Sequence, residues 1–297
     1  MPQVVLPALF TTGAAVGASY IAGTAITTAF VVKTFALNLA LTAAAKQLQP
    51  KIDAPSFGLS GQKNTITARV PNSTRKLIYG TTRVGGTIVF LESTDDDKYL
   101  HMVVVMAAHE VNNFNTIYLN DEALSLSGND VSSPSQYAGY VKVYPVTKGT
   151  VGNIPASLIS DTSWTSDHIL TDQAYVYLRL EYNVDAFPTG LPNISAEISG
   201  RKVYDTRSST TAYSNNPAMV IRDYLLDDTY GLGATSAEIN ETAFVTAANI
   251  CDESVALSGG GSENRYTVNG LVDTGNTPKA NIESLLTALK IVKMLNL

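Results

Sequence analysis

The sequence is short of the residues from which covalent or catalytic sites are usually recognised. Its single cysteine, Cys251, excludes an intrachain disulfide, and the apolar residues around it favour a small core residue over a reactive thiol. A lone cysteine also fits assembly in a reducing cytoplasm. The three histidines and scattered carboxylates form no zinc-binding spacing, nucleophile elbow, Walker loop or dinucleotide fingerprint. We therefore expect no catalytic residue, no cofactor and no metal ion.

Charge is scarce as well. Only 15% of the residues are charged, against about 25% in a typical soluble domain, while 45% are hydrophobic. This composition predicts that part of the surface is buried against partners. The net charge of −6 and the pI near 5.1 argue against an electrostatic nucleic-acid binder, which needs basic clusters to displace counterions from phosphates. DNA is expected to pass such a protein without being held by it.

The amino-terminal segment has no charged residue between Met1 and Val32. The apolar span 4–32 is long enough to cross a bilayer, which takes about 20 mostly apolar residues. It lacks the positive start of a secretory signal, so a cleaved leader is not expected. The Ala- and Leu-rich sequence that follows predicts helix as far as Pro50, which makes residues 1–50 one long apolar helical segment.

Two kinds of surroundings suit this apolar segment. Gly13 and Gly17 form a small-residue pair that allows close helix approach, and Tyr20, Ile21 and Phe30 are the large side chains expected to contact a partner or lipid. In the first, the helix is buried among copies of the chain. In the second, it lies in a membrane, where it is either inserted during infection or held as a permanent anchor. The glycines weaken an isolated span, because each lowers helix stability by about 1 kcal/mol relative to alanine.

The middle of the chain has the pattern of a β protein. Residues 51–63 are rich in proline, glycine and serine and predict a linker, and from 64 to 205 the apolar residues recur at every second position. Val141 and Val143 illustrate this alternation. The runs Thr87–Leu91 and His101–Ala108 are continuously apolar and suit strands covered on both faces, as in a barrel or sandwich. Asp95 to Lys98 between them predicts an exposed hairpin loop.

Two polar stretches interrupt this β-rich region, at 124–137 and 148–171, and are expected to be loops or an inserted subdomain. Its two histidines, His101 and His109, would lie roughly 26 Å apart along a straight strand, too far to share a metal. Paired carboxylates far apart in sequence could still serve a hydrolase, so an enzymatic role stays open as an alternative.

Residues 206–297 predict an α+β module. Asn216 is placed to cap a helix that begins at Pro217. Thr235 and Glu238 form a capping box for a second helix ending near Ser254. A strand is expected from Arg265 to Val268, followed by an Asn269-Gly270 hairpin turn, and a third helix begins at Thr277-Pro278. Asp223, Asp227 and Asp228 are expected on a solvated helix face and helix end.

The stretch 213–233 carries a recognisable motif. It contains Tyr213, Asn215, Asn216 and Pro217, then Tyr230, Gly231 and Gly233, and it is followed by Cys251-Asp252-Glu253-Ser254-Val255 and by Arg265-Tyr266-Thr267-Val268-Asn269-Gly270. In order and spacing, these segments resemble the hub region of the phage tail tip family to which protein J of phage lambda belongs. A looser resemblance begins near residue 63, with 75–80 and 84–86. Residues 1–50 show none.

The resemblance implies a structural virion protein, the central hub of a phage tail, connecting the tail tube to its tip and sealing the DNA channel until ejection. It implies a homotrimer in contact with the distal tail ring and tape measure proteins. Proteins of this family have further domains after the position that corresponds to Leu297. We therefore expect either a truncated or split hub, or partner chains that cover the last helix. The alternatives are a membrane-anchored surface binding protein, with 4–32 as its anchor, and a tail-associated cell-wall hydrolase.

Overall fold

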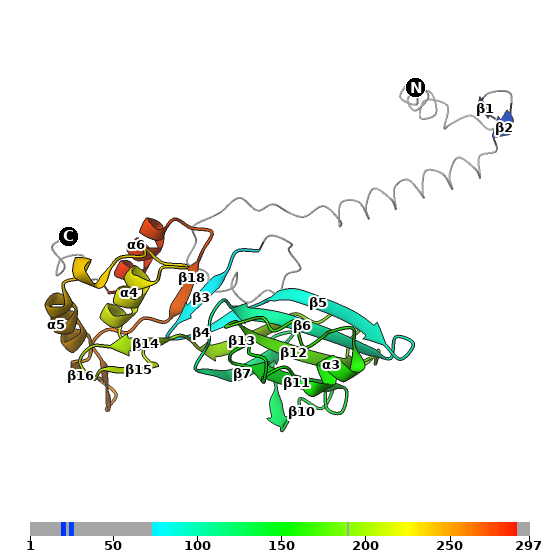
Figure 1. The fold of residues 1–297 in the computed structure, drawn as a ribbon. Helices are drawn as coiled ribbons and strands as arrows, with labels where there is room; N and C mark the ends of the chain where they lie inside the picture. The colour runs from blue at the N-terminus through cyan, green and yellow to red at the C-terminus, as the bar shows by residue number, and fades with distance from the viewer. Residues whose placement is uncertain (1–18, 22–23, 27–72, 189, 290–297) are drawn as a thin grey trace. The chain divides into compact units, whose positions relative to one another are not determined.

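The computed structural model describes residues 19–21, 24–26, 73–188 and 190–289, and the chain divides into two units, 1–59 and 60–297. In the first unit, β1 (Ser19–Ile21) and β2 (Thr24–Ile26) pair as antiparallel strands (Figure 1). The expected long helix is therefore wrong at these residues. Tyr20 and Ile21 lie in β1, where aromatic and β-branched residues are favoured. The rest of that helix, with Gly13, Gly17 and Phe30, lies outside the described residues, as do the linker and the predicted strand at 64–70.

The second unit contains a β-sandwich made of two antiparallel sheets. The six-stranded sheet has the order β5 (Thr87–Thr94), β6 (Tyr99–Ala107), β12 (Ala174–Glu181), β11 (Val141–Val146), β10 (Asp130–Ser133) and β9 (Ser125–Ser127). The four-stranded sheet has the order β4 (Thr81–Gly85), β13 (Ile194–Ser199), β7 (Asn113–Leu119) and β8 (Glu122–Ala123). Because β4 leads into β5 and β8 leads into β9, the chain crosses between the sheets at both edges.

The alternating pattern explains the sandwich core. Val143 lies opposite Leu178 in the pairing of β11 with β12, and both are fully buried together with Ile117, Ala196 and other inward-facing residues of both sheets. The expectation of barrel or sandwich sheets is thus borne out for the β-rich region. Burying such side chains stabilises a fold by about 1.5 to 3 kcal/mol each.

The two continuous apolar runs differ in their burial. In β6, Met102 and Val104 face the sandwich core while Val103 packs into a second cluster on the outer face, so coverage on both faces is confirmed there. In β5 the expectation is wrong, because Val89 lies at a bulge on this edge strand and is 46% exposed. The turn at Asp95–Lys98 joins β5 to β6 as predicted.

The polar stretches contain regular structure. The first, at 124–137, holds β9 and β10, which extend the larger sheet. The second, at 148–171, holds the short helix α3 (Ala156–Asp161), and its Leu158 and Trp164 cover Tyr175 and Tyr177 on the outer face of the sheet. Polarity alone did not indicate these elements, because most side chains of β9 and β10 are exposed.

A separate core gathers the carboxyl-terminal elements. It contains α4 (Pro217–Leu226), α5 (Glu241–Cys251) and α6 (Pro278–Leu289), with the hairpin of β14 (Lys202–Asp205) and β15 (Thr210–Tyr213) beside α4 (Figure 1). Cys251 is fully buried in it, as expected, and burial raises the pKa of its thiol. A second hairpin, β16 (Ser254–Ala256) with β17 (Ser262–Asn264), follows α5.

Within the described residues, no helix has the length and apolarity to cross a membrane.

Two local expectations in this module are wrong. The capping box of Thr235 and Glu238 exists, but it closes a single 3-10 turn, η3 (Ser236–Glu238), and α5 starts later, with Asn240 as its cap. Residues 265–268 form no strand, and Asn269-Gly270 makes no hairpin turn. Instead Gly270 opens β18 (Gly270–Asp273), which pairs with β3 (Lys76–Tyr79) from the far end of the unit. A local turn signal cannot reveal a partner so distant in sequence.

Strand β3 belongs to both cores. Because successive side chains of a strand point to opposite faces, Ile78 enters the sandwich core while Leu77 and Tyr79 enter the helical core, all three fully buried. On its other side, the amide of Arg201 donates to the carbonyl of Ile78 at 2.8 Å. A Cβ on Gly200 would lie 2.1 Å from that carbonyl oxygen, so this crossing requires glycine.

Candidate functional site around the motif helix

The first half of the motif lies at the start of α4. Asn216 is its N-cap: the side-chain Oδ1 accepts hydrogen bonds from the amides of Ala218 and Met219, and Pro217 occupies the first helical position. The Asn216 side chain is also buried, and its Nδ2 donates to the carbonyl of Ala248 in α5 at 3.0 Å. One side chain therefore starts one helix and binds it to another.

Two motif residues that precede the cap, Tyr213 and Asn215, tie this end of α4 to other elements. The carbonyl of Asn215 accepts a hydrogen bond from the amide of Val268 at 2.9 Å. The hydroxyl groups of Tyr213 and Thr81 lie 2.7 Å apart, which connects β15 to β4. The motif thus fixes a junction between strands and helices.

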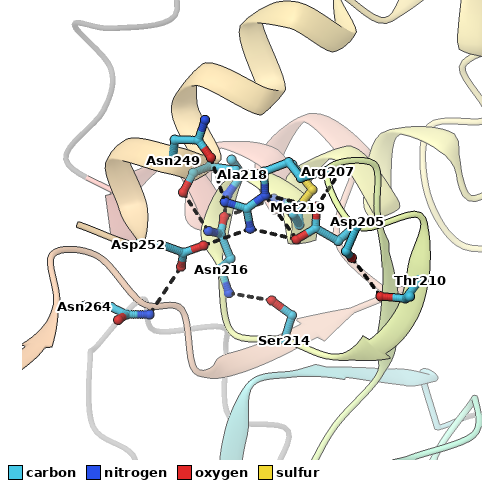
Figure 2. Close-up of polar contacts among 12 residues, drawn as sticks. Asp205, Arg207, Thr210, Ser214, Asn216, Ala218, Met219, Asn249, Asp252 and Asn264 are labelled. Atoms are coloured by element: carbon cyan, nitrogen blue, oxygen red, sulfur yellow. Dashed lines mark hydrogen bonds and ion pairs between the residues drawn. The ribbon is translucent and has the colours of Figure 1, made fainter. Parts of the chain in front are cut away.

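An arginine cluster beside this junction was not foreseen from the sequence. Figure 2 shows Arg207 with Asp205, Asp252 and Asn249 around it; its Nη2 lies 2.7 Å from Asp205 and 2.8 Å from Asp252, and its Nη1 donates to Asn249 at 3.1 Å. The hydrogen bond from Arg207 holds the pKa of Asp205 below its usual range despite partial burial. Because all of these groups satisfy one another, the cluster holds the β14–β15 hairpin against the end of α5.

The second half of the motif forms the turn after α4. The amide of Tyr230 donates to the Asp227 side chain at 2.8 Å, and the amide of Gly233 donates to the Asp227 carbonyl at 3.0 Å. Gly231 passes so close to the helix that a Cβ would lie 1.9 Å from the carbonyl oxygen of Tyr224, and Gly233 has φ of +70°. Both glycines are therefore required by the backbone path.

Beneath this turn lies a buried polar cluster formed by Tyr79, Arg201, Asp223 and Asp227. The Tyr79 hydroxyl donates to Asp223 Oδ2 at 2.7 Å, Arg201 Nε lies 3.3 Å from the same oxygen, and Arg201 Nη1 binds Asp227. The expected solvated position of Asp223 and Asp227 is wrong, since their side chains are only 19% and 6% exposed. Asp228 is exposed, as expected.

Burial and neighbouring charges shift the pKa values of this cluster in opposite directions. Desolvation raises the pKa of Asp223, although Arg201 and Tyr79 act against it. Desolvation also works to raise the pKa of Asp227, but the hydrogen bonds from Tyr230 and Arg201 outweigh it and the pKa is lowered. The pKa of Tyr79 is well above its ordinary value because of burial and the Asp223 charge. The two carboxylates share one guanidinium, which leaves the cluster dependent on Arg201.

An open pocket of about 440 Å³ adjoins this cluster, and we call it the seam pocket. Its lining comes from the segments that flank β6 and β12, from the β14–β15 hairpin and from the turn after α4: Ala108, His109, Glu110, Thr171, Asp172, Arg201, Lys202, Thr211, Asp227, Thr229 and Tyr230. Its charged side chains are paired: Glu110 lies 2.6 Å from Lys202 within the lining, and Lys148, outside the lining, lies 3.3 Å from Glu110 and 3.2 Å from Asp172. The pocket therefore presents balanced charge rather than a site selective for an anion or a cation.

His109 and His101 have structural roles as hydrogen-bond partners. His109 accepts a hydrogen bond from the amide of Ile78 at 2.9 Å and lies 2.6 Å from the carbonyl of Glu110, and burial lowers its pKa to about 4. His101 lies between Thr94 and Tyr177 on the outer face of the larger sheet. Within residues 73–188 and 190–289, no group of histidine, cysteine, aspartate or glutamate side chains is arranged to hold a metal ion.

No protein-family model matches the chain. The chain is similar to baseplate hub protein pb3 of Escherichia phage T5, with 29% identity over 143 residues, which is 41% of this chain and only 15% of that protein. Among solved structures, a chain of the virion of the native gene transfer agent particle aligns with a TM-score of 0.42 and 13% identity, covering 86% of this chain and 60% of the other.

Proposed function

We propose that this chain is a structural protein of a phage tail or baseplate. The observation that carries the proposal is the similarity to the T5 baseplate hub protein, which agrees in class with the motif at 213–233. The matched part spans a small share of that protein, so the resemblance concerns one module of a hub.

Within this class, the chain acts as a central hub of the tail, adapting the tail tube to its tip and sealing the channel until DNA is ejected. A homotrimer, in contact with the distal tail ring and tape measure proteins, is the assembly proposed. The low charge content supports burial against partners, and the acidic balance supports passage of DNA without binding.

The internal contacts suit a mechanical role. The motif residues make caps, close backbone approaches and hydrogen bonds that join β15, α4 and α5, and β3 ties two cores together. A part that transmits force between a tube and a tip needs such rigid joints. The motif at 213–233 resembles the tail tip family to which protein J of phage lambda belongs.

The apolar span 4–32 is proposed to contact copies of the chain or a membrane during infection. The rival function from another class is a membrane-anchored surface binding protein. Alkaline carbonate extraction of the expressed full chain separates the two, because an integral anchor stays in the membrane pellet and a hub protein is released.

A tail-associated cell-wall hydrolase is the enzymatic rival. A zymogram on peptidoglycan tests it directly: a cleared band at the mass of this chain would overturn a purely structural role.

The proposal itself is tested by the self-association of the purified full chain. Light scattering across micromolar concentrations is expected to give a trimer mass. A monomer at every concentration, together with the absence of the chain from purified particles, would contradict a hub.

A further inference from the structure

The hairpin formed by residues 254–264, which we call the arm, packs against little of its own chain. Every residue of its two strands is exposed except Val255, which is half-buried, and three consecutive glycines, 259–261, form its tip. A two-stranded hairpin without a packed face is only marginally stable in water. Its base is held by backbone hydrogen bonds, from the amide of Arg265 to the carbonyl of Glu253 at 2.8 Å and from the amide of Tyr266 to the carbonyl of Cys251 at 3.1 Å.

One face of the arm has a definite chemistry. Val255 pairs with Glu263 across the strands, and Leu257 follows two residues after Val255, so the three side chains point to the same face. Leu257 is 44% exposed, and Glu263 makes no ion pair with the described residues. This face therefore offers two aliphatic side chains and one exposed carboxylate.

A second pocket, which we call the entry pocket, has the complementary chemistry. It has a volume of about 160 Å³ and lies where residues 73–76 meet β5 and the end of β6. Its apolar lining includes Val89, Val105 and Met106, and its charged lining is Arg75 and Lys76 with no acidic residue. The pocket is open and its lining also includes Ser73, Thr74, Thr87 and Gln173. By volume alone, a cavity of about 150 Å³ accepts a benzene-sized group, so a leucine side chain fits it.

The cations of the entry pocket are not equally available. Lys76 donates to the carbonyl of Gly85 at 2.7 Å and faces Asp273 across the strand pair, and burial lowers its pKa. The Arg75 side chain is exposed and makes no ion pair with the part of the chain that the structure describes. Arg75 is thus the exposed cation of this pocket.

We propose that the arm of one copy of this protein docks into the entry pocket of a second copy, with Leu257 on the apolar lining and Glu263 beside Arg75. The inference rests on the self-association included in the proposed function. Because arm and pocket are different surfaces, each copy uses one to give and the other to receive, and such a head-to-tail contact closes into a ring when the rotation allows. A trimer is the smallest ring beyond a dimer.

Cysteine crosslinking between two separately purified full-length variants tests the contact. Leu257→Cys mixed with Val89→Cys is expected to form a disulfide-linked pair on a non-reducing gel, and native Cys251 does not interfere because it is buried. The control replaces the second variant by Val151→Cys, since Val151 is 72% exposed on another surface. Equal crosslinking of both mixtures, or none in either, would overturn the docking.

A charge exchange provides a second readout. Glu263→Arg and Arg75→Glu are each expected to weaken self-association about twofold to fivefold, the effect typical of an exposed ion pair, and the double variant is expected to restore it. All of these positions are exposed, so folding should be retained and is checked by circular dichroism. A trimer that forms unchanged in every variant leaves the proposed function standing and overturns this contact. A chain that never associates overturns both.

Discussion

The hydroxyl of Tyr79 donates a 2.7 Å hydrogen bond to the carboxylate of Asp223, although 144 residues separate the two in the sequence. Tyr79 comes from the strand shared by the two cores, and Asp223 comes from the motif helix. Arg201 completes the group from the crossing that lies beside β3. The motif helix is therefore bound to strand β3 through this buried polar cluster. Replacing Tyr79 or Arg201 should lower the stability of the fold.

Replacing Tyr79 by phenylalanine keeps the packing and removes the donor to Asp223. We expect a loss of about 2 kcal/mol in the free energy of unfolding, because a buried charged acceptor loses its partner. Urea unfolding of the full chain measures it. Tyr182→Phe is the matched control, since Tyr182 is 74% exposed, and an equal loss in both variants would contradict the role of the hydrogen bond.

Replacing Arg201 by methionine leaves Asp223 and Asp227 without their shared cation. We expect a larger loss than for Tyr79→Phe, about 3 kcal/mol, because removing one partner of a buried pair strands the other charges. Arg265→Met removes an exposed ion pair with Glu253 and should change the unfolding free energy by less than about 1 kcal/mol. Similar losses in the two variants would show that Arg201 acts as an ordinary surface residue.

Asn216 is expected to be more important than an ordinary helix cap. Asn216→Ala loses both the cap and the bond to Ala248, for a cost of about 2 to 3 kcal/mol, whereas Asn216→Asp keeps the capping oxygen and loses the donor. Asn240→Ala, at the exposed cap of α5, should cost about 1 kcal/mol. Thermal unfolding of the three variants ranks them, and the reverse order would refute the double role of Asn216.

Stability should fall in mild acid because of His109. Its pKa is 6.5 when unfolded and about 4 when folded, so between these values the unfolded chain binds more protons and stability decreases as the pH is lowered from 6.5 to 4. At about 1.4 kcal/mol per pKa unit, the loss from this group is at most about 3.5 kcal/mol. The raised pKa of Asp223 acts with the opposite sign, since its contribution is present at low pH and lost as the pH rises through the folded value.

The pH prediction is checked by unfolding free energies measured from pH 7 to pH 4. His109→Gln should flatten the decrease at the cost of lower stability at pH 7. A wild-type slope that survives in His109→Gln would assign the pH dependence to other groups.

The sequence predicted those parts of this architecture whose causes are local. Asn216 and Pro217 indicated the start of α4 because a cap and an N1 proline act within one helical turn. The alternation around Val141 and Val143 indicated strands because the pleat has a period of two. The turn at Asp95–Lys98 was predicted for the same reason, because its signal also lies within a few consecutive residues.

The features that sequence reasoning missed depend on contacts between distant segments. Asp223 looked like a surface residue because its partners, Tyr79 and Arg201, come from β3 and from the crossing after β13. Asn269-Gly270 looked like a hairpin because nothing nearby indicates that β18 pairs with β3. The Arg207 cluster has no local signal either, since Asp252 comes from beyond α5.

The most direct test of the central claim is the position of this chain in virus particles. A short epitope inserted in the exposed turn at Asp95–Asp97, away from both the arm and the entry pocket, can be labelled with a gold-conjugated antibody and seen by electron microscopy of purified particles. The structural hub account predicts label at one end of the tail and nowhere else. Particles without label, with the chain held instead in the envelope of host cells that contain no virus, would contradict it.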